Sequence, residues 1–164
     1  MDLVCLDTQI LIWGIQENAK LGQEDMIRRA QYLFRELSQA RTKALVPSVV
    51  IGEFLLKIPA SMHTMVLNLM REGFLTAPYD LQAAACFASL WQERDEGNII
   101  RYLRDELQAT RAELRADCMI VATAIVQKAS CIYSHDKKLK TFAGNAIQVI
   151  KLPREQDQLN LGFP

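Results

Sequence analysis

The spacing of hydrophobic residues changes period several times along the chain, between the compact apolar runs of strands and the three- and four-residue steps of helices. Apolar runs predict strands at residues 2–6, 44–46, 74–76, 131–134 and 146–152. Helical spacing predicts helices over residues 8–17, 24–41, 48–57, 61–72, 80–92, 98–129 and 137–143. Strands that alternate with helices favour a parallel sheet covered on both faces, so we predict an α/β fold.

Local signals set several of these boundaries. Ser48 is predicted to cap the helix that ends before Pro59, and Asp80 to cap the helix that starts there. Gly97 breaks the chain before the long stretch 98–129, which we expect to be bent or interrupted. No repeat or linker is visible. We therefore expect a single domain over residues 1–152, followed by a polar, loosely held tail at residues 153–164.

Composition and charge narrow the class of protein. The 164 residues carry 19 basic and 19 acidic side chains, so net charge alone indicates no particular partner. The cysteines lie among apolar residues without a CxxC spacing, which is typical of buried thiols in a reducing compartment: Cys5, Cys86, Cys118 and Cys131. Neither a signal peptide nor a membrane-spanning run is apparent, and we expect a cytoplasmic protein.

Two aspartates follow predicted strands. Asp7 comes directly after the first strand, inside the apolar segment VCLDTQILIW, and Asp136 follows the strand CIYS. In open parallel sheets, ligands bind at the carboxyl ends of strands. The structural alternative is that each aspartate only caps a turn or a helix.

Glu53 lies in the apolar helix segment VPSVVIGEFLLKIP. A carboxylate in such a helix has little access to water unless it faces a cleft. The alternative is an ion pair with Lys57 one turn later, which contributes only a few tenths of a kcal/mol. We therefore favour the cleft.

Asp117 interrupts an aliphatic stripe of the long helical stretch. That stripe consists of Leu103, Leu107, Leu114 and Val121. Asp117 projects into the same face, whereas Glu106 and Glu113 are expected to point away from it. A carboxylate that breaks a local pattern in this way is a candidate functional residue. If the helix breaks near Leu114, Asp117 becomes a helix N-cap instead.

Four carboxylates from four elements can meet at one edge of the sheet only with a counter-cation, because like charges a few Å apart raise each other's pKa. Oxygen ligands without histidine or thiolate favour Mg²⁺ or Mn²⁺. Both histidines, His63 and His135, are poor ligand candidates. A carboxylate-held metal suits hydrolysis of a phosphodiester, since it activates water and stabilises the leaving oxygen.

Four segments make the sequence resemble the PIN-domain ribonucleases, and especially the VapC-type toxins of toxin–antitoxin pairs. They are LDTQILIW, VPSVVIGEFLLKI, RADCMIVATAIVQKA and CIYSHDKKLKTF, in that order. The resemblance covers the chain from Asp7 to about Leu152. It implies a three-layer fold whose central parallel sheet has the strand order 3-2-1-4-5.

The same resemblance implies roles for particular residues. The metal-binding acids of the family match Asp7, Glu53, Asp117 and Asp136. Thr8 and Ser134 match hydroxyl residues that orient these carboxylates. The implied activity is that of an endoribonuclease dependent on one or two Mg²⁺ or Mn²⁺ ions, and the implied partners are an RNA substrate, an inhibitory antitoxin and a second copy in a homodimer.

The sequence departs from the family pattern in two places. Lys137 and Lys138 follow Asp136, where many members carry a further acid, and the segment 93–115 is longer than in compact toxins. That segment holds four arginines that share one side of a continuous helix: Arg101, Arg104, Arg111 and Arg115. They either bind RNA phosphates or form a solvated face paired with nearby acids.

Other classes of protein fit less well. A PIN-fold interaction module with a weak or silent nuclease site is the main alternative, and retention of all four acids argues against it. A haloacid-dehalogenase-type phosphatase needs a second aspartate where this chain has Gln9, and a receiver domain needs an acidic phosphoacceptor that residues 74–76 lack.

Overall fold

A five-stranded sheet in which every pair of neighbouring strands is parallel forms the centre of the computed structural model, which describes residues 2–154. Its strands are β1 (Leu3–Leu6), β2 (Lys43–Pro47), β3 (Leu75–Ala77), β4 (Cys131–Tyr133) and β5 (Gln148–Ile150). Their order is β3-β2-β1-β4-β5, with Cys5 opposite both Leu45 and Ile132. The predicted α/β class and strand order are therefore confirmed.

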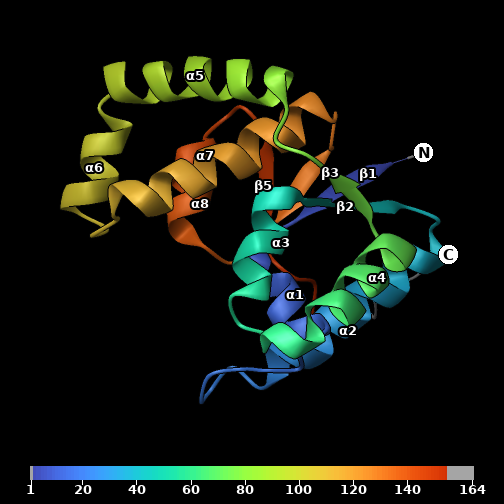
Figure 1. Cartoon of the computed structure of the whole chain (residues 1–164). Coiled ribbons are helices and arrows are strands. Elements are labelled where there is room, and N and C mark those ends of the chain that lie inside the picture. Colours follow the sequence, from blue (N-terminus) through green and yellow to red (C-terminus); the bar gives the residue numbers. More distant parts are fainter. Residues whose placement is uncertain (1, 155–164) are drawn as a thin grey trace, which may run out of the picture.

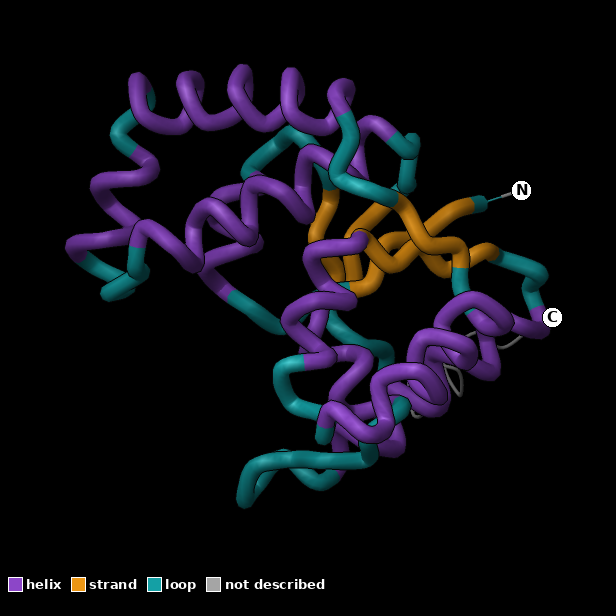
Figure 2. Tube along the Cα trace, in the orientation of Figure 1, coloured by secondary structure: helices purple, strands orange, loops and turns teal. Residues whose placement is uncertain are grey.

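Helices lie on both faces of the sheet (Figures 1 and 2). They are α1 (Thr8–Gly14), α2 (Asp25–Gln39), α3 (Ser48–Leu55), α4 (His63–Gly73), which a 3₁₀ turn η1 (Ala60–Met62) precedes, α5 (Leu81–Glu96), α6 (Ile99–Asp105), α7 (Arg111–Val126) and α8 (Lys137–Ala143). α7 packs on β2 and β4 and is covered by α5, while α1 packs with α2 on the other face. The result is the expected three-layer arrangement.

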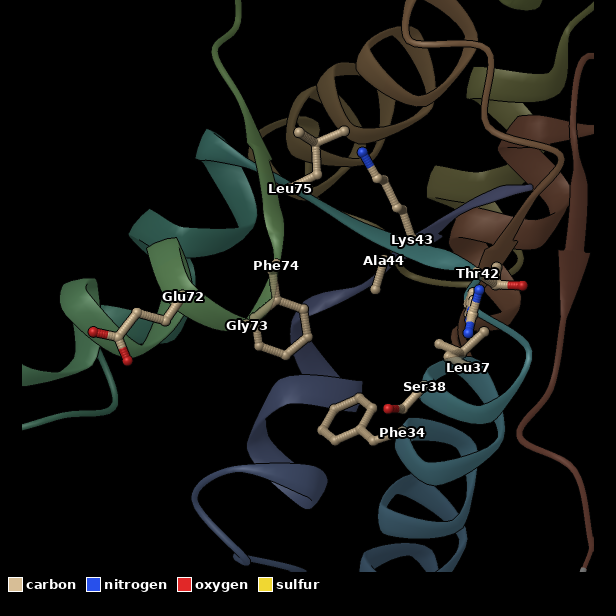
Figure 3. Close-up of a pocket in the computed structure, with 11 residues that line it drawn as sticks. Phe34, Leu37, Ser38, Thr42, Lys43, Ala44, Glu72, Gly73, Phe74 and Leu75 are labelled. Atoms are coloured by element: carbon tan, nitrogen blue, oxygen red, sulfur yellow. The ribbon is translucent and has the colours of Figure 1, made fainter. Parts of the chain in front are cut away.

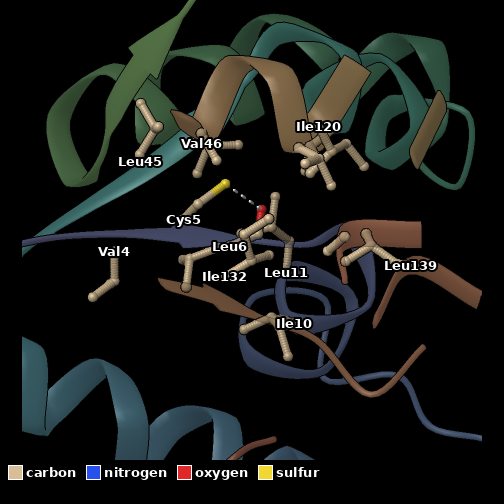
Figure 4. Close-up of a cluster of buried hydrophobic side chains, with 14 of the residues drawn as sticks. Val4, Cys5, Leu6, Ile10, Leu11, Leu45, Val46, Ile120, Ile132 and Leu139 are labelled. Carbon is tan, nitrogen blue, oxygen red and sulfur yellow. Dashed lines mark hydrogen bonds between the residues drawn. The ribbon is translucent and has the colours of Figure 1, made fainter. Parts of the chain in front are cut away.

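The core explains why the first strand is an uninterrupted apolar run. Figure 4 shows Ile120 of α7 on one side of β1 and Ile10 of α1 on the other. Leu6 between them is fully buried, as is Ile132 on the neighbouring strand. A strand that is covered on both faces has no solvent side, so its sequence does not alternate. All four cysteines are free, and Cys86 is only half-buried.

Several predicted boundaries are wrong, among them the end of the helix predicted over residues 80–92, which extends to Glu96. The first helix ends at Gly14 and not at residue 17. Ser48 is the first residue of α3 and provides no side-chain cap, because its hydroxyl accepts the Tyr79 N–H at 3.1 Å. The last strand covers only Gln148–Ile150. By contrast, Asp80 caps α5 as predicted, accepting the Ala83 N–H at 2.9 Å.

The long stretch 98–129 is interrupted, forming α6 and α7. Between them Gln108 adopts a left-handed φ of 52°, which a continuous helix does not permit. Thr110 then begins α7 with a capping box, in which its hydroxyl accepts the Glu113 N–H and the Glu113 carboxylate accepts the Thr110 N–H. Because Thr110 is the cap, the alternative that Asp117 caps the second half of the helix is wrong.

Most of the polar tail predicted at residues 153–164 lies outside the described residues. Just before it, the Arg29 side chain of α2 donates hydrogen bonds to the backbone carbonyls of Leu152 and Pro153. Among residues 2–154, no helix combines the length and the apolar character needed to cross a membrane.

Candidate functional site

One pocket of about 330 Å³ collects the predicted acids. We call it the acid pocket; its lining residues are Asp7, Thr8, Gln9, Trp13, Lys20, Gln23, Glu53, Glu113, Asp117, His135 and Asp136. Asp7 reaches it from the loop after β1, the central strand, and Asp136 from the loop after the adjacent strand β4. The other two predicted acids come from α3 and α7. The side chains predicted to converge therefore line a common pocket at the carboxyl edge of the sheet.

Asp7 is held from two sides. Its Oδ1 accepts the Thr8 N–H at 2.7 Å, which caps α1, and its Oδ2 accepts the Ser134 hydroxyl at 2.6 Å. The residue is only 8% exposed. Burial, together with the charges of Asp136 and Glu53, raises the pKa of Asp7 to about 6, although the hydrogen bonds from Ser134 and Thr8 act in the opposite direction.

Thr8 connects Asp7 to the next acid. Its hydroxyl donates to Glu53 Oε2 at 2.5 Å, across from α1 to α3. Within residues 2–154 Glu53 makes no ion pair with Lys57, so the structural alternative for this carboxylate is not realised. Asp7 and Glu53 are thus oriented by the N–H and the hydroxyl of a single residue.

Asp117 is the acid with the most perturbed environment. It lies on α7 between Leu114 and Val121, which are both fully buried. Burial first, and then the charges of Asp136 and Asp7, raise the pKa of Asp117 to about 8. Among residues 2–154 no donor or cation is bound to this carboxylate.

Glu113 was expected to point away from the aliphatic face that Asp117 shares, and it is exposed, but it also lines the acid pocket. Residues four apart in a helix lie one above the other, and both side chains line the acid pocket. Glu113 differs from Asp117 in having partners, Thr110 and the Lys138 ammonium, and these hydrogen bonds lower its pKa.

Asp136 completes the site as the N-cap of α8, accepting the Lys138 N–H at 2.7 Å. Its own N–H donates to the Ser134 hydroxyl at 3.0 Å. Since the same hydroxyl donates to Asp7, Ser134 links the acids that follow β1 and β4. The hydroxyl residues Thr8 and Ser134 are therefore in contact with the carboxylates.

The residues fit a hard divalent cation by their chemistry. The predicted donors are all carboxylates, and one of them, Asp117, is half-buried and has no counter-charge among the described residues. As the side chains stand, no group of three or more acidic, histidine or cysteine residues within the described chain is arranged to hold a metal ion. Without a cation, repulsion among the carboxylates keeps them apart. A bound divalent ion would attract them and draw their oxygens together.

The four arginines do not form the single stripe predicted for a continuous helix, because Arg101 and Arg104 belong to α6 whereas Arg111 and Arg115 belong to α7. None of them lines the acid pocket. The exposed Arg101 pairs with Asp105 at 3.5 Å, as the solvated-face alternative expects.

Other lining residues were missed from the sequence. Lys20 and Gln23 come from the polar loop between α1 and α2, where no periodicity marks them. His135 and Trp13 also line the pocket, with ring centroids 5.4 Å apart. His135 Nε2 accepts the Leu152 N–H at 3.0 Å, and burial lowers the pKa of His135, so the ring is a structural acceptor. In the sequence, only the position of His135 next to Asp136 indicated that it lies near the pocket.

A second groove, of about 490 Å³, lies at the opposite ends of the strands, where β2 and β3 begin. Figure 3 shows Phe34 and Phe74 facing one another there, with ring centroids 5.7 Å apart. Its walls include Lys43, Ala44 and Leu75, but none of the predicted acids. The four predicted acids therefore lie at the carboxyl edge of the sheet and not in this second groove.

Comparisons with known proteins agree with this fold. The PIN domain family model matches residues 4–145. Among solved structures, VapBC2 from Rickettsia felis bound to a DNA fragment from their promoter is similar, with 12% identity, a TM-score of 0.66, and coverage of 92% of this chain and 99% of that one. DNA-bound VapBC from Salmonella typhimurium has 16% identity, a TM-score of 0.56, and coverage of 93% and 100%. No curated protein matches the sequence.

The chain therefore belongs to the PIN-domain family, whose members are generally nucleases that use divalent metal ions. The two solved structures establish the likeness of fold.

Proposed function

We propose that this protein is a metal-dependent endoribonuclease that hydrolyses RNA phosphodiester bonds, with Mg²⁺ or Mn²⁺ as its ion and residues 1–152 as its PIN domain. The observation that carries the proposal is the placement of Asp7, Glu53, Asp117 and Asp136 around one pocket in a chain of this family. These four carboxylates would hold the ion. When bound, a divalent ion supplies an activated water and neutralises charge on the phosphate.

The chain's own residues orient this chemistry. Ser134 and the Thr8 N–H fix the two oxygens of Asp7, so its carboxylate enters the reaction already aligned. Glu53 has one oxygen bound by the Thr8 hydroxyl, which leaves the other to act as a ligand or to accept a proton from the attacking water. Lys20, from the loop after α1, is the cationic side chain that lines the pocket.

The decisive experiment compares the wild type with Asp7→Asn on a labelled single-stranded RNA, in Mn²⁺ and in EDTA. We expect cleavage only by the wild type and only with the metal. Equal cleavage by both proteins, or cleavage that survives chelation, would overturn the proposal. If calorimetry detects no Mn²⁺ binding and no RNA is cut, the alternative of a PIN-fold interaction module with a silent site is favoured.

We further propose that the protein is the toxin of a type II toxin–antitoxin pair. Support comes from the fold, since the two similar structures are VapBC complexes. An encoded small DNA-binding protein beside this gene should bind the chain and abolish RNA cleavage. Expression of the chain alone should arrest growth and Asp7→Asn should not; growth at the normal rate with active enzyme present would contradict the toxin role.

A further inference from the structure

One lysine spans two of the elements that form the acid pocket. The backbone N–H of Lys138 donates to Asp136 at 2.7 Å, and its ammonium lies 3.3 Å from Glu113 Oε1. Both acids line the acid pocket. The Lys138 side chain is 26% exposed and does not itself line the pocket, but it connects the first turn of α7 to the start of α8.

Both carboxylate oxygens of Glu113 already accept hydrogen bonds, and one of these comes from a cation. Its Oε2 accepts the Thr110 N–H at 2.7 Å in the capping box, and its Oε1 is occupied by the Lys138 ammonium. Asp117, one turn further along the same helix, has no such partner within residues 2–154. The two neighbouring carboxylates of α7 therefore differ in role: one is already neutralised, and the other is available.

We propose that the Lys138 ammonium replaces a second metal ion on the α7–α8 side of the acid pocket, so that the protein binds one divalent ion per chain. This inference rests on the proposed function. An ammonium beside Glu113 repels a second cation, and it already compensates the charge of the carboxylate that such an ion would need. The remaining acids, Asp7, Glu53, Asp117 and Asp136, serve the single ion.

The neighbouring lysine provides a matched control. Lys137 is exposed, and its side chain makes no ion pair with the described residues. Lys137→Gln and Lys138→Gln remove the same charge one residue apart, but only the second breaks the contact with Glu113. Circular dichroism and thermal melts check that both variants fold.

Calorimetric titration with Mn²⁺ on the full chain tests the proposal. We expect one ion for the wild type and for Lys137→Gln. Lys138→Gln should release Glu113 and show a second binding event, together with roughly fivefold tighter binding of the first ion. Two ions on the wild type, or identical titrations for the two variants, would overturn the inference.

Failure of this inference is distinguishable from failure of the proposed function. One bound ion without RNA cleavage would contradict the nuclease and leave the stoichiometry standing. Two bound ions with metal-dependent cleavage would contradict only the role of Lys138. Because wild-type stoichiometry is read directly, the result does not depend on the behaviour of a variant.

Discussion

The Ser134 hydroxyl joins the acids of two neighbouring strands: it donates to Asp7 at 2.6 Å and accepts the backbone N–H of Asp136 at 3.0 Å. A hydroxyl can do both because it carries one donor and two acceptor positions. Ser134 is 2% exposed, so neither bond can be replaced by solvent without rearrangement. The separation of the two aspartates is therefore set by a third, uncharged side chain.

Ser134→Ala should lower both stability and cleavage. We expect a loss of roughly 1–2 kcal/mol in the free energy of unfolding, because a buried acceptor loses its donor. RNA cleavage should fall by about tenfold or more as Asp7 loses its orientation. Urea denaturation and initial rates measure the two effects. Ser130→Ala is the control, since that hydroxyl bonds to Leu3 O at 3.0 Å at an exposed position. Equal behaviour of the two variants would contradict the assigned role.

Thr8→Val should impair the site with little change in shape. Valine keeps the branched side chain but cannot donate to Glu53. We expect a several-fold lower cleavage rate, while Thr8→Ser, which keeps the hydroxyl, should retain most of the activity. If the valine and serine variants cleave equally well, the hydrogen bond to Glu53 has no part in the reaction.

Stability of the metal-free protein should fall as the pH rises toward 8. Asp7 and Asp117 have folded-state pKa values of about 6 and about 8, whereas an unfolded aspartate titrates near 4. The folded state thus binds more protons than the unfolded state across this range, and raising the pH favours unfolding. Urea melts in EDTA at pH 5 to 8 measure this slope.

Asp117→Asn should remove the part of that slope between about pH 6 and pH 8. His135, whose pKa is lowered by burial, titrates in both proteins, so its contribution cancels in the difference between them. Saturating Mn²⁺ should reverse the wild-type slope, since metal binding needs deprotonated carboxylates. Parallel curves for the wild type and the variant would show that Asp117 is not perturbed.

Arg94→Met should destabilise the fold from outside the site. The buried Arg94 of α5 donates to the carbonyls of Phe142 and Ala143 at the end of α8, at 2.6 and 2.9 Å. Losing these bonds should cost roughly 2–4 kcal/mol. The control is Arg101→Met, at an exposed position of α6, for which we expect little change in the urea midpoint. Comparable shifts for both variants would refute a special role of Arg94.

The fold could be predicted well because each of its main signals is local. Short apolar runs such as Val4 to Leu6 indicated strands buried on both faces, and their alternation with helices indicated a parallel sheet. The strand order, by contrast, came from the family resemblance. The break before α7 was expected only in general terms, since the left-handed turn at Gln108 leaves no strong mark in the sequence.

The site was predicted where polar residues interrupt apolar patterns, as Asp7, Glu53 and Asp117 do. Residues from irregular loops, such as Lys20, were missed because no pattern surrounds them. The arginine stripe failed because a helical wheel assumes one unbroken axis, and the chain turns between Asp105 and Arg111. Contacts across elements, such as Lys138 with Glu113, cannot be read from spacing at all.

The acids of the pocket are spread over almost the whole described chain, and the last of them, Asp136, precedes only α8 and β5. A ribosome makes the chain from its N-terminus, so a nascent polypeptide that already carries Asp7, Glu53 and Asp117 still lacks the fourth carboxylate. The proposed metal site therefore stays incomplete until the segment after β4 has been made and has folded.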